Sequence, residues 1–250
     1  MSLKKSLAAA VAAATISSFV NAETIDIGIV YTEQAEAYTG NISAKIDQYI
    51  TYANNSFDRN DIDIQLNLVG TASISRDRRP TEDDIRAIAA SSDYQNWRAS
   101  KNADMVILLG MSESDGRFTT CGIAFVGEGS NGTMYPDSRD SAYSITAVDC
   151  GYNTFVHELG HNLGLSHSVR QGDTSGGVYS YGLGHGVLNK FSTIMAYPHS
   201  FNTTTQYDWF SDPDWVECSG LPCGERVNGQ DISNAYRALG PVVDDVAGYY

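Results

Sequence analysis

The chain has 250 residues, and its 30 acidic side chains outnumber 16 lysines and arginines, which gives a formal net charge of −14. This surplus of negative charge repels polyanions, so it argues against nucleic acid or an anionic membrane as a partner. The length is sufficient for one substantial hydrophobic core, and we expect a single domain that acts as a monomer.

The N-terminal segment has the pattern of a secretory signal peptide. Two lysines precede an alanine-rich apolar run over residues 7–20, and Val20 and Ala22 are small residues at the two positions that a signal peptidase recognises. The apolar run is too short for a membrane span. We therefore predict a signal peptide over residues 1–22, secretion after its removal at about Ala22, and a mature domain over residues 23–250.

The next segment predicts a strand, a helix and a second strand. Apolar residues alternate over residues 24–31, recur at helical spacing over residues 42–57, and alternate again over residues 62–68. Asn41 is placed to cap the helix. A strand, a helix and a strand in this order indicate a parallel pair joined by a crossover.

Four further segments extend the predicted sheet. Thr81 precedes a short helix with acidic residues in its first turn, and residues 105–109 form a compact apolar run that is typical of a buried central strand. Residues 121–127 and 143–148 are two short strands, of which the second leads into another helix. The order of these elements predicts an α/β fold built on a twisted, mostly parallel sheet.

A long loop is predicted over residues 127–141, which are rich in glycine, asparagine, aspartate and serine. Its acidic residues Glu128, Asp137 and Asp140 carry the carboxylates that Ca²⁺ prefers. Their spacing, however, matches no defined calcium loop. A calcium ion is therefore unsupported, and we expect a solvated loop.

Residues 157–167, with the sequence HELGHNLGLSH, contain three of the five histidines. His157 and His161 are four residues apart, so on a helix both side chains project from one face. Gly164 permits a left-handed turn that ends the helix and brings His167 round as a third ligand. Three neutral nitrogens with one open position are typical of a catalytic zinc site, whereas a structural site has four protein ligands.

Glu158 follows the first of these histidines and supplies the predicted chemistry. Zinc lowers the pKa of a bound water to about 7, and Glu158 is placed to take its proton and pass it to a leaving amine. We therefore predict a zinc-dependent endopeptidase with one catalytic Zn²⁺. One alternative is a catalytically silent, zinc-stabilised binding or toxin-like module, which needs no base at position 158. The other is a metal-scavenging protein, for which one site in a chain of this length would be a poor store.

The zinc motif resembles that of the metzincin metalloendopeptidases, and residues 192–197 (STIMAY) resemble the methionine-containing turn of that family. The resemblance implies that Met195 lies beneath the three histidines; the alternative is an ordinary buried methionine. It also implies that the Tyr197 hydroxyl hydrogen-bonds the tetrahedral intermediate, as in the astacin and serralysin branches. The alternative for Tyr197 is a packed aromatic ring with its hydroxyl at the surface.

The chain after the zinc motif predicts an irregular region. Residues 172–186 are crowded with glycine, serine and tyrosine. We expect His185 and His199 to form local hydrogen bonds rather than to bind metal. Asp231 is placed to cap a final helix that continues past a break at residues 240–241.

Four cysteines, an even number in an exported chain, predict disulfides. Of the three possible pairings we prefer Cys121 with Cys150 and Cys218 with Cys223, because each pair joins neighbours and encloses a loop. Because the histidines already supply a metal site, we expect no metal-binding role for the cysteines.

Most of the mature chain resembles the secreted, reprolysin-like metzincins of the bacterial type, including the peptidyl-Asp metalloendopeptidases. The supporting segments occur in family order: residues 25–32, 121–125, 157–167, 193–197, 210–213 and 234–235. The resemblance implies an upper subdomain of about residues 23–164 with one antiparallel edge strand, and an irregular lower subdomain of about residues 165–250 that ends in a helix. It also implies that an extended peptide substrate pairs with the edge strand near Gly122 to Val126; an ordinary internal strand is the alternative.

Two features depart from the family pattern. Ser168 follows the last histidine, where reprolysins have an aspartate, and the first predicted strand begins directly after the signal peptide, which leaves no room for an inhibitory prodomain. If the peptidyl-Asp comparison extends to specificity, a cationic residue should line the pocket beside the methionine turn. Arg170, Lys190 and Arg226 are the candidates, although the negative charge of the chain opposes acidic substrates.

Overall fold

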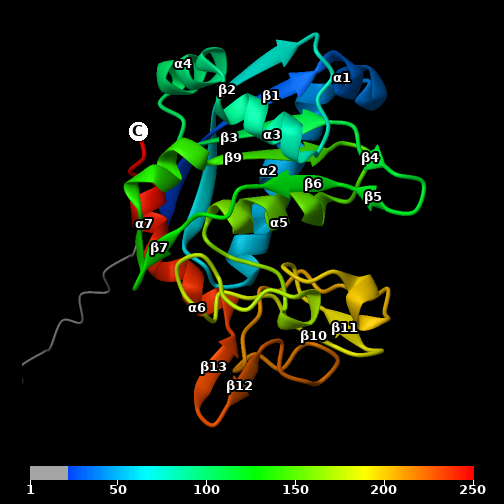
Figure 1. The fold of residues 1–250 in the computed structure, drawn as a ribbon, viewed down its shortest axis with the longest axis vertical. Helices are drawn as coiled ribbons and strands as arrows, with labels where there is room; N and C mark the ends of the chain where they lie inside the picture. Colours follow the sequence, from blue (N-terminus) through cyan, green and yellow to red (C-terminus); the bar gives the residue numbers. More distant parts are fainter. Residues whose placement is uncertain (1–21) are drawn as a thin grey trace, which may run out of the picture.

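A five-stranded sheet forms the centre of the computed structural model, which describes residues 22–250 (Figure 1). The strand order is β2-β1-β3-β9-β6. The first four strands of this order are parallel, and β6 pairs antiparallel with β9 at the edge. The predicted sheet, mostly parallel with one antiparallel edge strand, is confirmed. The strands are β1 (Glu23–Thr32), β2 (Ile64–Ile74), β3 (Met105–Gly110), β6 (Gly122–Ala124) and β9 (Tyr143–Ala147).

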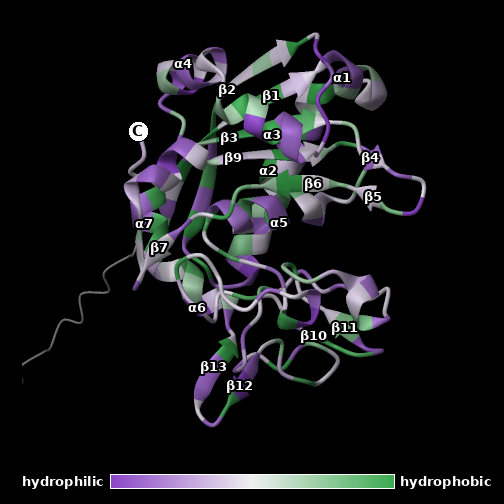
Figure 2. Ribbon diagram, viewed as in Figure 1, coloured by the Kyte–Doolittle hydropathy of each residue, from purple (hydrophilic) through white to green (hydrophobic). Residues whose placement is uncertain are grey.

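Helices cover both faces of this sheet. Helices α2 and α5 pack on one face around the apolar side chains of β1 and β3, and α3 and α4 pack on the other. Hydrophobic residues accordingly concentrate on the strands and on the inner sides of the helices (Figure 2). The helices are α1 (Glu33–Thr39), α2 (Ile42–Arg59), α3 (Glu82–Ala89), α4 (Ser92–Lys101), α5 (Tyr152–Asn162), α6 (Ala235–Leu239) and α7 (Val243–Val246), with 3₁₀ turns η1 (Pro136–Ser141), η2 (Val169–Gln171), η3 (Pro198–Phe201) and η4 (Gly240–Val242).

The helix caps follow from the sequence in most cases. The side chains of Asn41 and Thr81 accept hydrogen bonds from the first turns of α2 and α3, as predicted. The predicted cap at Asp231 is wrong, because Asn234 caps α6 and accepts a hydrogen bond from the Arg237 amide. Asp231 lies instead in a strand and forms ion pairs with Arg226 and Arg237. A carboxylate that is bound to two guanidinium groups is not free to cap a helix.

Short hairpins make up most of the remaining regular structure. The hairpin β4–β5 precedes β6, and β7–β8 lies in the segment predicted as a loop. The hairpins β10–β11 and β12–β13 lie in the irregular part that follows α5, below the sheet in Figure 1. These strands are β4 (Glu113–Ser114), β5 (Thr119–Thr120), β7 (Gly129–Ser130), β8 (Thr133–Met134), β10 (Gly186–Val187), β11 (Phe191–Ser192), β12 (Glu225–Val227) and β13 (Gln230–Ser233).

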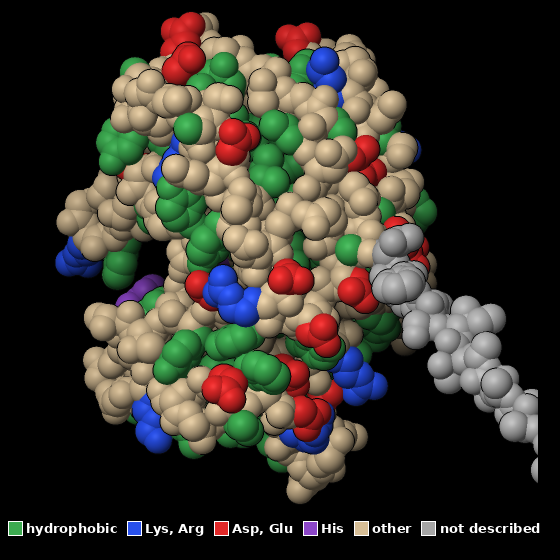
Figure 3. Space-filling model, turned by 180° about the vertical axis from the view of Figure 1, so that it is seen from behind, with side chains coloured by type: hydrophobic (Ala, Val, Ile, Leu, Met, Phe, Trp, Pro, Cys, Tyr) green, Lys and Arg blue, Asp and Glu red, His purple; other side chains and the backbone are tan. Residues whose placement is uncertain are grey.

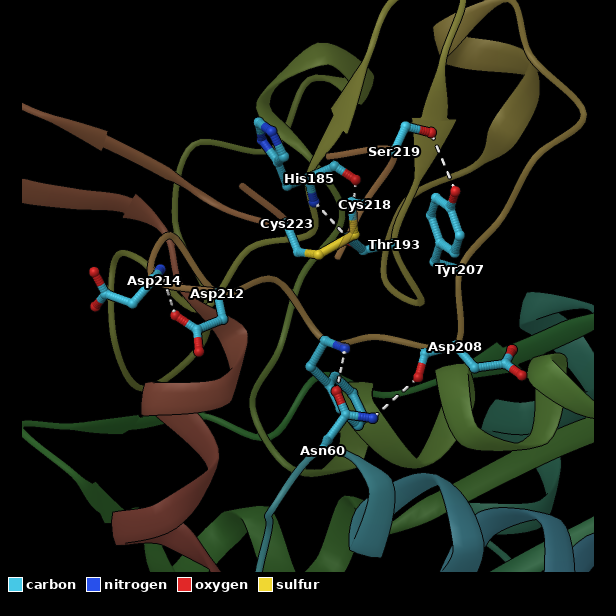
Figure 4. Close-up of a disulfide and its surroundings, with 11 residues drawn as sticks. Asn60, His185, Thr193, Tyr207, Asp208, Asp212, Asp214, Cys218, Ser219 and Cys223 are labelled. Carbon is cyan, nitrogen blue, oxygen red and sulfur yellow. Dashed lines mark hydrogen bonds between the residues drawn. A yellow bond between two sulfur atoms is a disulfide. The ribbon is translucent and has the colours of Figure 1, made fainter. Parts of the chain in front are cut away.

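Both predicted disulfides are confirmed. Cys121 is bonded to Cys150, which joins the residue before β6 to the loop before α5. Cys218 is bonded to Cys223 and packs against Phe191 in a small apolar cluster of the lower part (Figure 4). The two bonds therefore stabilise the rim above α5 and the irregular segment below it.

The lower part is attached to the end of α2 through Asn60. The Asn60 amide nitrogen donates to the carbonyl of Asp208 at 3.0 Å, and its amide oxygen accepts from the amide of Phe210 at 2.8 Å (Figure 4). The Tyr52 hydroxyl donates to the Asp208 carboxylate at 2.6 Å. These bonds position the segment that follows the methionine turn.

The signal peptide and membrane-spanning segments are considered in turn for the described part of the chain. The predicted signal peptide, residues 1–22, lies outside the described residues except for Ala22. Within residues 22–250, none of the helices combines the length and the apolar character that a membrane crossing requires.

Candidate metal centre

Helix α5 places two of the predicted ligands on one face. His157 and His161 lie one turn apart, and their ring centroids are 4.7 Å from each other. The helix ends two residues before Gly164, whose φ of 85° is the left-handed conformation predicted for it. The Gly164 amide donates to the His161 carbonyl at 2.9 Å, and the turn carries the chain back towards His167.

The three histidines converge on one point. Nε2 of His161 lies 3.1 Å from Nε2 of His157 and 3.2 Å from Nε2 of His167. Nitrogen ligands at tetrahedral zinc are separated by about 3.3 Å, since each Zn–N bond is about 2.0–2.1 Å long. The spacing therefore fits one zinc ion. Among residues 22–250, these three form the only cluster of at least three potential metal ligands.

Main-chain carbonyls orient the two helical histidines. Nδ1 of His157 lies 2.8 Å from the carbonyl of Ile194, and Nδ1 of His161 lies 2.8 Å from the carbonyl of Leu165. A carbonyl oxygen only accepts, so each Nδ1 carries the proton and each Nε2 keeps its lone pair directed at the centre. This is the tautomer that binds a metal.

A carboxylate orients the third histidine. Oδ2 of Asp173 lies 3.3 Å from Nδ1 of His167 and accepts a hydrogen bond from the His167 amide at 2.8 Å. Ser168, which follows this histidine in place of the family aspartate, donates to Gln171 instead. Sequence reasoning missed Asp173, because the loop between positions 168 and 172 has no periodic pattern that would predict its path.

Burial shifts the pKa values of the ionisable groups in the centre. Burial and the neighbouring imidazoles lower the pKa of His157 well below its ordinary value and that of His161 to about 4. Burial also lowers the pKa of His167. The histidines are therefore neutral at pH 7, which is the state that coordinates a metal. Burial raises the pKa of Glu158 well above its ordinary value.

Glu158 lies between the histidines and the edge strand. Its side chain is directed into the cleft, and a Cβ atom at Gly122, the first residue of β6, would collide with its carboxylate oxygen Oε1. Only glycine at this position leaves room for the carboxylate. The edge strand and the carboxylate thus form one side of the same cleft.

The sequence model of metallo-peptidase family M12B, Reprolysin-like, matches residues 43–168, which is half of the chain and includes all three histidines. The chain belongs to this family. The metzincin resemblance seen in the sequence is therefore confirmed at the level of the reprolysin-like peptidases.

Three similar proteins extend the comparison. A peptidyl-Asp metalloendopeptidase of Pseudomonas aeruginosa is 34% identical over 99% of this chain and 44% of its own length. A protein of the same name from Stenotrophomonas maltophilia is 29% identical over 80% of this chain and 48% of its own length. The chain thus spans less than half the length of these relatives. A solved structure titled "Structure of a chaperone-substrate complex" superposes with a TM-score of 0.68 at 22% identity, covering 92% of this chain and 35% of that one, and shows a shared fold.

The methionine turn of this M12B chain lies directly under helix α5. Met195 is fully buried, and a Cβ atom at Gly160 of α5 would come within 2.5 Å of its sulfur. Tyr197, two residues later, lies beside the histidines. Its ring centroid is 5.5 Å from that of His157 and 4.7 Å from that of His167. The structure thus brings both residues to the metal centre.

The M12B chain has a cleft of about 730 Å³ that contains His157 and Glu158. Its other lining residues are Arg117, Phe118, Thr119, Thr120, Cys121, Gly122, Asn153, Thr154, Tyr197, Pro198, His199 and Gln206. None of the three cations expected for the pocket beside the methionine turn lines this cleft. Arg170 lines a separate cavity with His185, Lys190 lies in the turn between β10 and β11, and Arg226 is paired with Asp214 and Asp231.

The two remaining histidines lie outside the metal cluster. The main chain of His185 forms a hydrogen-bonded pair with the Thr193 hydroxyl (Figure 4). His199 lies at the cleft, where its ring is 5.6 Å from that of Tyr197 and 6.4 Å from that of Phe118. His199 thus belongs to the cleft wall, which its position in the sequence did not indicate.

Proposed function

We propose that residues 23–250 form one catalytic domain of an exported, zinc-dependent endopeptidase that acts as a monomer. One observation carries the proposal: three Nε2 atoms converge beside a buried carboxylate, in a cleft bordered by a free sheet edge. The family membership supports peptidase chemistry, and the two disulfides suit an oxidising compartment outside the cytosol.

His157, His161 and His167 would hold the zinc, and Glu158 would move the proton. Bound zinc supplies a Lewis acid that polarises a carbonyl and lowers the pKa of water to about 7. The buried Glu158 carboxylate is placed to take a proton from the attacking water and to deliver it to the leaving amine. Its burial raises its pKa, so it holds that proton between the two steps.

Tyr197 would stabilise the oxyanion that develops on the substrate carbonyl. Its ring lies 4.7 Å from the His167 ring at the edge of the centre. Burial and the neighbouring Glu158 carboxylate raise the pKa of Tyr197 to about 12. The hydroxyl therefore stays protonated at pH 7 and can donate a hydrogen bond where negative charge develops.

An extended peptide would bind along β6. Within residues 22–250 this strand is the sheet edge, since one side pairs with β9 and the other has no partner strand. Gly122, its first residue, lies against the Glu158 carboxylate. Main-chain pairing of a peptide with β6 near Gly122 to Val126 would lay the scissile bond across the metal centre.

The substrate preference that we propose is for an acidic residue next to the scissile bond. The relatives described above are named peptidyl-Asp metalloendopeptidases. The net charge of −14 opposes acidic substrates over the whole surface, so a local cation is needed in the cleft.

The experiment that tests the function is digestion of an unfolded protein, with chelator and then with added zinc. Chelator-sensitive, zinc-restored cleavage supports the proposal, and cleavage that persists without metal contradicts it.

The carboxylate of Asp173 should strengthen zinc binding through His167. We expect Asp173→Asn to raise the zinc dissociation constant about 10- to 100-fold, which is typical for loss of an outer partner of a metal ligand. Competition with a chromophoric chelator measures this constant directly. Asp137→Asn, a change in the 3₁₀ turn η1 before β9, is the matched control. Equal zinc affinity in Asp173→Asn and the parent would contradict this role.

Gly122 should be required for the position of the catalytic carboxylate. In Gly122→Ala the new methyl group collides with Glu158 and displaces its carboxylate. We therefore expect kcat to fall by roughly 10²-fold or more, which approaches the decrease in kcat caused by removing a general base. Zinc content should stay at the parental value, because no ligand changes. Gly240→Ala is the control, since a Cβ there meets open space. Full activity in Gly122→Ala would mean that the carboxylate lies elsewhere.

A further inference from the structure

The hairpin β4–β5 overhangs the cleft beside the metal centre. Its tip, residues 115–118, carries Arg117 and Phe118, and both line the same cleft as Glu158 and Tyr197. Figure 3 shows the notch between the upper and lower parts at the left edge, with basic and hydrophobic side chains projecting above a histidine. The hairpin therefore forms the roof of the substrate site.

Arg117 is the only lysine or arginine among the residues that line the cleft, and Glu158 is the only carboxylate there. Among the described residues, no Asp or Glu forms an ion pair with the Arg117 guanidinium. Arg226, by contrast, is bound to two aspartates. Arg117 thus presents an unpaired positive charge, in a strongly negative protein, to the cleft that contains Glu158.

The hairpin tip is held in place by its own hydrogen bonds. Oδ1 of Asp115 accepts from the amides of Arg117 and Phe118, at 2.8 Å each. Asp149 anchors the start of the hairpin by accepting from the amide and hydroxyl of Ser112, and the Cys121–Cys150 bond anchors its end. A hairpin whose main chain is already fixed loses less main-chain entropy when Arg117 binds a ligand.

The direction of the substrate decides which side chain meets Arg117. Antiparallel pairing is the slightly more stable arrangement per residue, so a peptide bound to β6 should run opposite to it. The hairpin precedes β6 in the chain. The part of the peptide on the C-terminal side of the scissile bond then lies under the hairpin, next to Arg117.

We propose that Arg117 determines the specificity of the enzyme, by binding the carboxylate of an Asp or Glu side chain on the C-terminal side of the scissile bond. The guanidinium matches a carboxylate with two parallel hydrogen bonds. The selecting group thus lies in the roof of the cleft, on a hairpin tip, and not beside the methionine turn below. This inference rests on the proposed peptidase function and assigns its selectivity to one residue.

The test uses two peptides that differ only by Asp or Asn at the residue after the scissile bond. The readout is the ratio of kcat/KM for the Asp peptide to that for the Asn peptide. We expect a ratio of about 10 to 100 for the zinc-loaded parent, as for a hydrogen bond between charged groups, and a ratio near 1 for Arg117→Gln. Arg117→Glu should prefer a third peptide, with Lys at this position, over the Asp peptide.

Arg170→Gln is the control, because Arg170 lies outside the cleft and should keep the parental ratio. An unchanged ratio in Arg117→Gln, with active enzyme, would overturn the role of Arg117 and leave the peptidase function intact. A parental ratio of 1 would also overturn it. A zinc-loaded parent that cleaves none of the peptides would overturn the proposed function and this inference together.

Discussion

Glu158→Gln should lose most of its peptidase activity and keep its zinc. The substitution removes the proton acceptor beside the metal centre but changes no ligand, so we expect kcat to fall about 10²- to 10⁴-fold. The side chain keeps its size, which matters because Gly122 leaves no spare room at Oε1. Kinetics on a fluorogenic peptide, with zinc content measured on the same sample, checks both halves of the expectation.

The stability of this variant gives an independent check. Glu158 is buried, and burial of a carboxylate destabilises its charged form, so its pKa is raised. Replacing it with a neutral amide should therefore not lower the melting temperature. A variant that unfolds early would explain lost activity by misfolding. A stable, zinc-loaded variant with parental kcat would exclude Glu158 as the base.

His161→Ala should lose the metal itself. His161 lies between the other two histidines, with its Nε2 3.1 Å and 3.2 Å from theirs, so its removal leaves only two of the three ligands. We expect a loss of zinc affinity larger than the about 10- to 100-fold expected for an outer partner such as Asp173. Dialysis against a weak chelator followed by elemental analysis measures what remains bound.

The matched control for this variant is His185→Ala, which changes the same residue type outside the cluster. It should retain about one zinc per chain. If His161→Ala also retained stoichiometric zinc after dialysis, the metal would be held elsewhere. If both variants lost zinc, the loss would reflect general destabilisation and not removal of a ligand.

The parts of the structure that could be predicted are those set by local rules. His157 and His161 share a face because a helix repeats every 3.6 residues, and Gly164 takes the left-handed turn because it lacks a Cβ. The order of strands and helices likewise predicted the mostly parallel sheet, and the family resemblance implied its antiparallel edge strand. Cys121 and Cys150 were paired correctly because four cysteines allow three pairings and the preferred pairing joins neighbours in the sequence.

The site residues that the sequence did not predict depend on contacts between segments that have no periodic sequence pattern. Asp173 meets His167 only because an irregular loop folds back on the zinc motif. Arg117 reaches the cleft only because a hairpin of two-residue strands brings it there. Arg170, Lys190 and Arg226 were the cations expected beside the methionine turn, and none of them lines the cleft that contains Glu158.

The amphipathic pattern also understated burial in the first strand. Alternation over residues 24–31 predicted a strand without showing that both of its faces are covered, and Gly28 and Val30 are buried on the face where α3 and α4 pack. A Cβ at Gly28 would come within 2.7 Å of the Trp97 ring, so a glycine here allows α4 to pack closely. Helix α4 was not predicted, because its sequence has few apolar residues to mark a buried face.

The most direct test of the central claim is mass-spectrometric cleavage profiling. The zinc-loaded chain and its Glu158→Gln variant are incubated in parallel with a diverse peptide mixture, and new internal termini are sequenced. We expect the parent to produce many new termini, mostly by cleavage of the bond before Asp or Glu, and the variant to produce few. A folded, zinc-loaded parent that produces no new termini would contradict it and would favour a zinc-stabilised binding module.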